Sequence, residues 1–285
     1  MCIGAAKSAT TSLYDILRQH SNVYLPSFKE PHFFDNPNNY HNGIEWYSKT
    51  YFNDSSNKDK IGDFTPTYLF ESNAAERIYK DLGPSVRFIV ILRDPVERAY
   101  SHYLHSTRDQ NEKLSFIDAL EKEKERTKES YLDKLRFSYI AQGLYYNMLQ
   151  EYFKFFPREN FFFISFEDDF LKNIKGTIQN VFKFLDLENE NIDVNIISNR
   201  ASKPRLIWLK RIMNRKGWWR SIIKFFLPSL KIRQIIRNKI HRANLKVYSP
   251  KRLSNYDKKI IFDRYFIDDV NSLEKMIGRK MNWGK

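Results

Sequence analysis

Residues 86–103 read VRFIVILRDPVERAYSHY, and the first seven of them decide the fold. Apart from one arginine, residues 86–92 are all apolar, which is typical of a parallel strand buried on both faces of a sheet. The run ends at an Arg-Asp-Pro sequence, in which Asp94 is a favourable helix N-cap and Pro95 suits the first helical position. The stretch therefore predicts a buried strand that leads directly into a helix.

Strands and helices alternate on both sides of this stretch. Residues 2–3 end a short strand, and a helix is expected over 8–19, while the apolar run 161–166 predicts another buried strand with a helix near 177–185. Because strands that alternate with helices form parallel sheets, we expect an α/β fold whose central parallel β-sheet is flanked by helices. Further helices are expected over 114–131 and 139–156, and a helix or helix pair over 254–277. Surface loops are expected over 36–42 and 54–60.

The composition narrows the class of protein. A chain of 285 residues with 42% apolar content is long enough for one large α/β core, so we expect a single domain over 1–285. We find neither an apolar run of about 18 residues, as a membrane-spanning helix needs, nor a signal-peptide pattern. The single cysteine, Cys2, excludes an internal disulfide framework and a cysteine-based zinc site. We therefore expect a cytoplasmic protein.

The positive charge is concentrated in one segment. The formal net charge is +14, but residues 201–252 hold 16 of the 48 Lys and Arg residues and no Asp or Glu, which leaves 32 basic against 34 acidic residues elsewhere. We therefore divide the chain into an α/β core over 1–200, a basic, aromatic, helical insertion over 201–252, and C-terminal helices over 253–285 that close the core. The aromatic residues of the insertion include Trp208, Trp218, Trp219, Phe225 and Phe226.

Four interpretations of the 201–252 insertion remain open. It could lie on an anionic membrane, at the inner face, with its aromatic side chains at the interface. It could line a cleft for an acidic glycan, or it could be a solvated helical appendage packed on the sheet. Nucleic acid is the fourth possibility, but no base-reading or RNA-binding motif is present, so we expect no nucleic-acid partner.

The first candidate anion site opens the chain. Residues 4–13 read GAAKSATTSL, which is shorter than the G-x-x-x-x-G-K-[ST] loop for triphosphates because Lys7 follows Gly4 by only three residues. The N-terminus of the following helix offers unpaired N–H groups and partial positive charge, and Lys7 adds a full charge. The alternative is a helix start with a Ser/Thr-rich cap and no ligand. The hydroxyl groups nearby belong to Ser8, Thr10, Thr11 and Ser12.

The second candidate anion site follows the strand over 86–92. Arg93 stands at the end of that strand, where its guanidinium could make two bonds to a phosphate, and Ser101 follows about two helical turns later. Arg98 could serve the same purpose or pair with an acid, and Arg93 itself could form only a surface ion pair. Two basic sites favour a ligand with two separated anionic groups.

Other classes of protein stay open at this point. A P-loop kinase or NTPase would need an acidic residue at a strand end to hold Mg²⁺, and Glu167 or Asp168 could play that part after the strand over 161–166. A membrane-associated binding protein without catalytic activity is the third hypothesis.

Several motifs together resemble the sulfotransferase family that uses 3′-phosphoadenosine 5′-phosphosulfate (PAPS), particularly its carbohydrate branch of heparan sulfate sulfotransferases and bacterial relatives. The resemblance implies a P-loop NTPase-like fold. It spans most of the chain in the expected order and is weak over 201–252. Ala9 departs from a position where the family often has glycine, and Phe64 from one where some glycan sulfotransferases have a substrate-facing lysine. The matching segments are GAAKSATTSL (4–13), KEPHFFD (29–35), GDFTPTYL (62–69), ILRDPVERAYSHY (91–103), FISFEDDF (163–170) and LEKMIGRKMNW (273–283).

The resemblance implies in-line transfer of a sulfuryl group from PAPS to a hydroxyl of a glycan or lipid-linked saccharide, with 3′-phosphoadenosine 5′-phosphate (PAP) as product and without a metal. Lys7 would stabilise the charge that grows on the leaving phosphate. The implied donor-binding residues are Lys7, Ser8, Ala9, Thr10, Thr11 and Ser12 at the 5′ end, Arg93 and Ser101 at the 3′-phosphate, and Lys203 and Arg205 from a loop that closes over the nucleotide in the family.

The KEPHFFD segment carries the catalytic base in the glycan branch, and the resemblance points to Glu30 first and His32 second. Pro31 favours an extended local backbone, in which these two side chains point the same way. One could take the proton while the other orients it or the sulfuryl oxygens. Asp35 and Asp63 are expected to support the site or to contact the acceptor. The alternative is a surface ion pair between Glu30 and its neighbouring lysine, and a half-buried, hydrogen-bonded His32.

Overall fold

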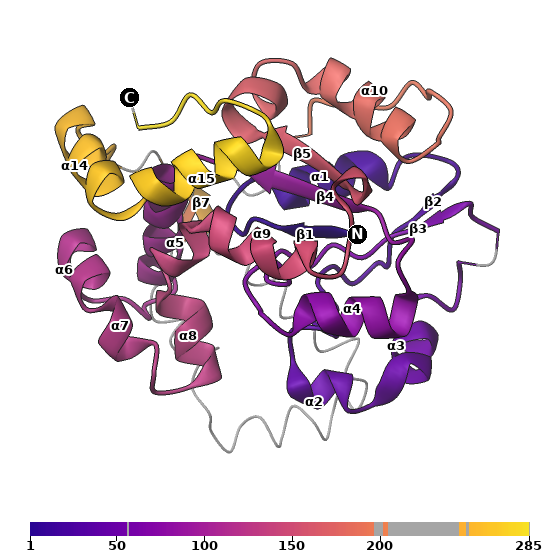
Figure 1. Ribbon diagram of the computed structural model, residues 1–285, viewed down its shortest axis with the longest axis horizontal. Helices are drawn as coiled ribbons and strands as arrows, with labels where there is room; N and C mark the ends of the chain where they lie inside the picture. Colours follow the sequence, from indigo (N-terminus) through magenta and orange to yellow (C-terminus); the bar gives the residue numbers. More distant parts are fainter. Residues whose placement is uncertain (56, 197–201, 205–244, 249–250, 285) are drawn as a thin grey trace.

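A three-stranded parallel sheet forms the centre of the molecule (Figure 1). In the computed structural model, its strands are β1 (Cys2–Gly4), β4 (Phe88–Leu92) and β5 (Phe161–Ser165), in the order β1-β4-β5. The predicted α/β fold with a central parallel sheet is confirmed. The structure describes all residues except 56, 197–201, 205–244, 249–250 and 285.

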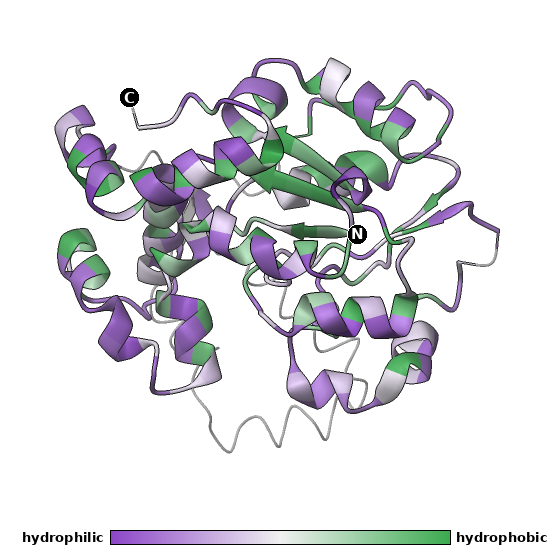
Figure 2. Cartoon of the chain, in the orientation of Figure 1, coloured by the Kyte–Doolittle hydropathy of each residue, from purple (hydrophilic) through white to green (hydrophobic). Residues whose placement is uncertain are grey.

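The central strand β4 explains why its sequence is apolar throughout. Its neighbours β1 and β5 occupy both of its edges, and all five of its side chains are buried. Because successive side chains of a strand point to opposite faces, Phe88, Val90 and Leu92 belong to one hydrophobic cluster, and Ile89 and Ile91 to another. The two strands β4 and β5 appear as the continuous hydrophobic ribbons at the centre of Figure 2.

Helices cover both faces of this sheet (Figure 1). The helices α1 (Thr10–Leu17) and α10 (Ile174–Phe184) bury apolar side chains in the cluster of Ile89 and Ile91. The larger cluster on the other face takes its side chains from α4 (Ala74–Leu82), α5 (Pro95–Arg108), α9 (Tyr145–Phe153), α14 (Asn255–Tyr265) and α15 (Ile267–Ile277).

Shorter elements complete the described part of the chain. The parallel pair β2 (Val23–Tyr24) and β3 (Lys60–Ile61) and the antiparallel pair β6 (Ser202–Pro204) and β7 (Leu245–Val247) lie outside the central sheet. The remaining helices are α2 (Pro37–Tyr40), α3 (Gly43–Tyr51), α6 (Phe116–Glu121), α7 (Glu123–Arg126) and α8 (Tyr131–Phe137), with 3₁₀ turns at Ala141–Gly143 and Arg158–Asn160 and a π-helical turn at Phe166–Phe170.

Several predicted boundaries are wrong for identifiable reasons. The loop expected over 36–42 contains α2, which Asn36 caps by accepting a hydrogen bond from the backbone N–H of Asn38, with Pro37 at the first helical position. The helix expected over 114–131 is broken into α6 and α7. The helix or helix pair expected over 254–277 is a pair, α14 and α15.

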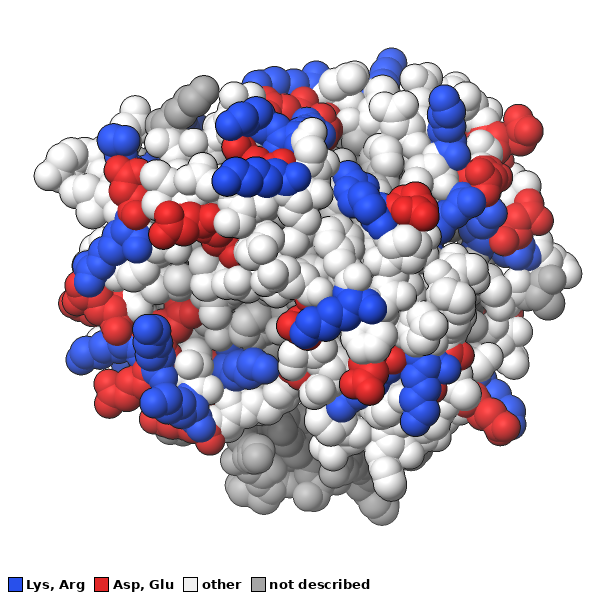
Figure 3. Space-filling model, viewed as in Figure 1, with Lys and Arg blue, Asp and Glu red and all other residues white. Residues whose placement is uncertain are grey.

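The basic insertion lies mostly outside the described residues. Of residues 201–252, the strands β6 and β7 are described, and the expected helices and their aromatic residues are not among the described residues, so they remain a prediction. On the face of the molecule shown in Figure 3, cationic and anionic side chains are interspersed, as expected from the near balance of charge outside the insertion. None of the described helices is long and apolar enough to cross a bilayer.

The segment 62–69 lies beside β1, although it is not a strand of the central sheet. The backbone N–H of Cys2 donates to the carbonyl of Asp63 at 2.8 Å, and that of Leu69 donates to the carbonyl of Ile3 at 2.9 Å. The GDFTPTYL segment therefore runs directly beside β1. A Cβ atom at Gly4 would lie 2.7 Å from the Cδ2 atom of Leu69, so only glycine permits this approach.

We predict that Gly4→Ala lowers the free energy of unfolding by about 1–3 kcal/mol, because the added methyl group forces Leu69 and its backbone to shift in a packed core. Urea denaturation followed by circular dichroism measures this change. A free energy of unfolding equal to that of the wild type would show that β1 and the 62–69 segment can move apart without loss of stability.

Candidate active site

The loop between β1 and α1 has an unusual backbone. Lys7 and Ala9 have φ angles of 70° and 63°, in the left-handed region that residues with a side chain rarely adopt. Ala9 is the N-cap residue of α1 and makes no side-chain capping hydrogen bond. The left-handed conformation at Ala9 is one that glycine adopts without strain, which explains why glycine is frequent there in related loops. The left-handed residues also explain why α1 begins at Thr10 rather than at Ser8.

The two predicted anion sites lie side by side. Arg93, at the end of β4, donates from its Nη1 atom to the backbone oxygen of Lys7 at 3.0 Å, across 86 residues of sequence. Its guanidinium carbon lies 4.9 Å from the ring centroid of Phe166, and its Nη2 atom lies 3.7 Å from the carboxylate of Glu97. The sheet order β1-β4 brings these two loops together at one edge of the sheet.

Unpartnered polar atoms and an altered pKa mark this edge of the sheet as suited to an anion. The hydroxyl oxygen of Ser8 and the Nε atom of Arg93 are buried and have no hydrogen-bond partner. Burial lowers the pKa of the Lys7 ammonium to about 8, with further lowering by the charge of Arg108. Buried donors without partners are costly, so an anion between these loops would supply what they lack.

The helix α5 continues the second anion site. Asp94 caps it by accepting hydrogen bonds from the backbone N–H groups of Val96 and Glu97 at 2.9 and 3.1 Å. Ser101 lies on this helix and is partly buried. Arg98 is wholly buried and donates to the carbonyl of Tyr139, so its guanidinium does not reach a surface where it could bind a ligand.

The remaining donor-site residues are placed as follows. Thr10, Thr11 and Ser12 form the first turn of α1. Lys203 lies in β6, which runs beside α5, and Arg205 lies outside the described residues. The roles of all these residues stay predictions.

The KEPHFFD segment forms a line of three ionisable side chains from the interior to the surface. Asp35 is fully buried, whereas the side chains of His32 and Glu30 are 36% and 40% exposed. The Nδ1 atom of His32 lies 2.9 Å from Oδ2 of Asp35, and its Nε2 atom lies 3.8 Å from Oε2 of Glu30. Lys29 pairs with the other oxygen of Glu30. The hydroxyl of Thr67 donates to the same Asp35 oxygen.

The backbone prediction for this segment is wrong, although the two side chains do meet. Glu30 and His32 have φ angles of 64° and 50°, so neither residue is extended. Both lie in the left-handed region, one on each side of Pro31, where strain of about 1–3 kcal/mol per residue is expected. Such strain persists only where the surrounding structure holds the segment, and at this site it turns Glu30 and His32 toward each other.

The charge of Asp35 governs the imidazole of His32. Burial alone would lower the pKa of His32, but the hydrogen bond and the charge of Asp35, together with the charges of Glu30 and Asp63, outweigh it and raise the pKa. The neighbouring carboxylates thus shift the His32 equilibrium toward its protonated form.

Asp63 lies behind the site and not in it. It is 2% exposed, and it accepts hydrogen bonds from the hydroxyls of Tyr47, Thr65 and Tyr68 at 2.7, 2.7 and 2.8 Å. The Tyr68 oxygen in turn accepts from the backbone N–H of Phe33 at 3.0 Å. Burial raises the pKa of Asp63, while these hydroxyl donors act in the opposite direction. Of its two expected roles, this geometry favours support of the KEPHFFD segment over contact with an acceptor.

Two residues that hold the site were missed in the sequence. Thr67 and Tyr68, both in the GDFTPTYL segment, bind Asp35 and the backbone of Phe33. The match of this segment to the family was the available signal for them. Phe64 stands where some glycan sulfotransferases have a substrate-facing lysine. In this structure Phe64 is buried and packs edge-on against Tyr14, with 5.6 Å between the ring centroids.

The acidic residues considered as Mg²⁺ ligands are engaged in protein contacts. Glu167 accepts from the backbone N–H of Asp94 and from the indole N–H of Trp283, each at 3.0 Å. Asp168 pairs with Lys172 at 2.6 Å and accepts from Asn282 at 3.1 Å. Across the described residues, no three His, Cys, Asp or Glu side chains gather as a metal-binding group.

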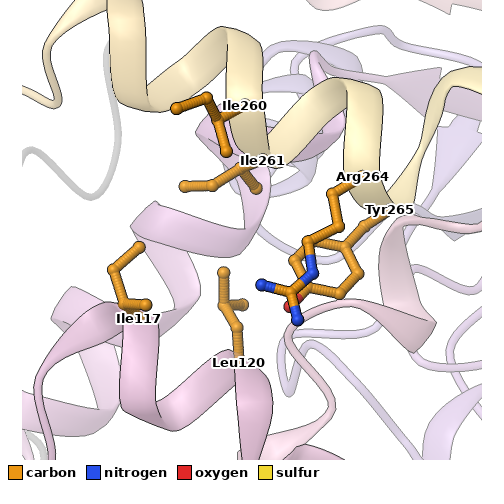
Figure 4. A pocket seen from close by; sticks show the side chains of 6 residues that line it. All are labelled: Ile117, Leu120, Ile260, Ile261, Arg264 and Tyr265. Atoms are coloured by element: carbon orange, nitrogen blue, oxygen red, sulfur yellow. The ribbon is translucent and has the colours of Figure 1, made fainter.

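A separate cavity of about 70 Å³ lies between α6 and α14 (Figure 4). None of the candidate site residues lines it, and its wall is mostly apolar. The side chains that line it are Ile117, Leu120, Ile260, Ile261, Arg264 and Tyr265.

We predict that Asp35→Asn lowers the pKa of His32 by about one to two pH units, because removal of the buried negative charge destabilises the imidazolium. An NMR titration of the His32 ring protons measures it, with Asp59→Asn, an exposed surface carboxylate, as the control. A His32 titration that Asp35→Asn leaves unchanged would contradict the pairing.

The chain is similar to known sulfotransferases. A family model described as "Sulfotransferase domain" matches residues 1–215. Heparan sulfate glucosamine 3-O-sulfotransferase 5 of Mus musculus is 29% identical over 197 residues, and heparan sulfate glucosamine 3-O-sulfotransferase 3B1 of the same species is 30% identical over 199 residues. The matched regions cover 69% and 70% of this chain, which spans 56% and 48% of the two relatives.

The fold comparison reaches further along the chain. A crystal structure of a sulfotransferase from Alicyclobacillus acidocaldarius is 25% identical, has a TM-score of 0.70, and covers 98% of this chain and 95% of its own. The resemblance to carbohydrate sulfotransferases that the motifs indicated is thereby confirmed. With a family model that matches three quarters of its length and a solved relative that shares its fold, the chain belongs to the sulfotransferase domain family.

Proposed function

We propose that the protein transfers a sulfuryl group from PAPS to a hydroxyl group of a glycan. The observation that carries the proposal is the contact between Arg93 and the carbonyl of Lys7, which joins two basic loops at one edge of the sheet. A donor with one anionic group at its 5′ end and a second on its 3′ oxygen suits two adjacent sites. A triphosphate clustered at one loop does not need the second site.

The residues present fit this donor. The buried, unpartnered Ser8 hydroxyl and Arg93 Nε atom are positioned for anionic oxygens, and the N-terminus of α1 has no side-chain cap. We assign the 5′ end to Lys7 and to residues 8–12, and the 3′-phosphate to Arg93 and Ser101. When bound, PAPS supplies the sulfuryl group. Lys7 places a positive charge where negative charge develops on the departing phosphate.

Glu30 is proposed as the base that takes the proton from the acceptor hydroxyl. It is partly exposed, and the ammonium of Lys29 and the imidazole of His32 lie on its two oxygens. These two neighbours hold the Glu30 side chain in one orientation, from which it would accept the proton of an acceptor hydroxyl. His32, oriented by Asp35, holds Glu30 from one side and offers its Nε2–H to oxygens of the reacting groups.

The acceptor class rests on the relatives. Two are named heparan sulfate glucosamine sulfotransferases, which supports a saccharide acceptor for this chain. A lipid-linked saccharide and contact of the 201–252 insertion with an anionic membrane belong to the same proposal, because that insertion carries 16 cationic residues without an acid.

We predict that the wild type binds PAP much more tightly than ADP and that Arg93→Ala reduces this preference by at least about tenfold, since a charge-assisted hydrogen bond contributes about 1.5–3 kcal/mol. Calorimetry with both nucleotides measures the ratio. Arg18→Ala, at the other end of α1, serves as the matched control. Equal affinities of the wild type for PAP and ADP would instead favour a P-loop kinase or NTPase.

We predict that Glu30→Gln lowers turnover at least about 100-fold while the affinity for PAP changes less than about threefold, because the amide keeps the shape of the side chain but cannot accept the proton. Transfer of label from radiolabelled PAPS to a glycan measures turnover. Near-normal transfer by this variant would exclude Glu30 as the base.

A further inference from the structure

The acidic run that ends β5 anchors the chain segment 279–284. Arg279 makes two hydrogen bonds to Asp169, at 2.6 and 2.8 Å. Asn282 donates to Asp168, and the indole N–H of Trp283 donates to Oε2 of Glu167. Three consecutive acidic residues thus bind three residues of one short segment.

Glu167 and the 279–284 segment also form hydrogen bonds with the turn between β4 and α5. The Oε1 atom of Glu167 accepts from the backbone N–H of Asp94 at 3.0 Å, and the backbone N–H of Gly284 donates to Oδ2 of Asp94 at 3.1 Å. Tyr145 donates to the carbonyl of Arg93 at 2.9 Å, and its ring lies 5.8 Å from that of Trp283. The single peptide group that joins Arg93 to Asp94 is therefore held at its carbonyl by Tyr145 and at its N–H by Glu167.

The contact is tightly packed. Trp283 is 6% exposed. Gly284 has a φ angle of 73°, and a Cβ atom there would lie 2.6 Å from the Phe262 ring, so the segment fits only with glycine. Burial raises the pKa of Glu167, while its two hydrogen bonds act in the opposite direction. A carboxylate with a donor on each oxygen cannot turn without losing one of them.

The contacts of Glu167 and Gly284 with Asp94 lie directly beside Arg93 in the chain. A bidentate contact between a guanidinium and a phosphate depends on the direction in which the side chain leaves its backbone. That direction is set by the turn which Glu167 holds. Asp168 and Asp169 bind the same segment through Asn282 and Arg279.

We propose that Glu167, held in place by Trp283, is a positioning residue for the 3′-phosphate: it fixes the β4–α5 turn and so sets the preference for nucleotides that carry a 3′-phosphate. The inference rests on the proposed function. It assigns Glu167, Trp283 and the 279–284 segment a part in the nucleotide specificity of the donor site. The same carboxylate that a magnesium-dependent enzyme would use for metal binding serves here to orient an arginine.

The test compares the ratio of the dissociation constants for ADP and PAP among four proteins, by calorimetry on the full chain. Glu167→Gln keeps one acceptor oxygen and the shape of the side chain, and Trp283→Phe removes the indole N–H. In both we expect the ratio to fall about five- to tenfold while the affinity for ADP changes less than twofold. Asn282→Ala, which removes the neighbouring contact to Asp168, is the matched control and should leave the ratio unchanged.

The outcomes separate this inference from the proposed function. A wild type without a preference for PAP contradicts the proposed function and this inference with it. A wild type that prefers PAP, with an unchanged ratio in Glu167→Gln and Trp283→Phe, contradicts only the positioning role. A parallel loss of affinity for both nucleotides, with a lowered unfolding temperature, shows a structural role and also overturns it.

Discussion

The hydrogen bond from the Arg93 guanidinium to the carbonyl of Lys7 is the contact on which the site depends. It forms only because β1 and β4 are neighbours in a parallel sheet, so that both strands end at the same edge. Each loop alone is an ordinary strand-to-helix turn with a basic residue. Together they present two separate positive groups, and the proposed 3′-phosphonucleotide donor rests on this separation.

The parts of the fold that could be predicted are those in which burial imposes a simple pattern. A strand with both faces covered has a nearly continuous run of apolar residues, which located β4 and β5. Asp94 and Pro95 marked the start of α5 because capping is a local interaction. The left-handed conformations at Glu30 and His32 could not be predicted, since residues without glycine's freedom adopt them only under tertiary constraint.

The residues that support the site were harder to read from the sequence than those that would touch ligands. Asp63, Tyr68 and Thr67 act through hydrogen bonds between segments distant along the chain, and only the folded structure shows which hydroxyl meets which carboxylate. Glu167 has the same character: its residue type suited a metal ligand, and its contacts join the β4–α5 turn to Trp283. Residue type therefore indicated the chemistry available, and contacts determined how each group is used.

A crystal structure of the protein with bound PAP tests the central claim most directly. The account predicts that the 5′-phosphate lies at the N-terminus of α1 beside Lys7, and that the 3′-phosphate lies within hydrogen-bonding distance of Arg93 and Ser101. A 3′-phosphate that contacts neither of these two side chains, or a nucleotide bound away from the edge where β1 and β4 end, would contradict it.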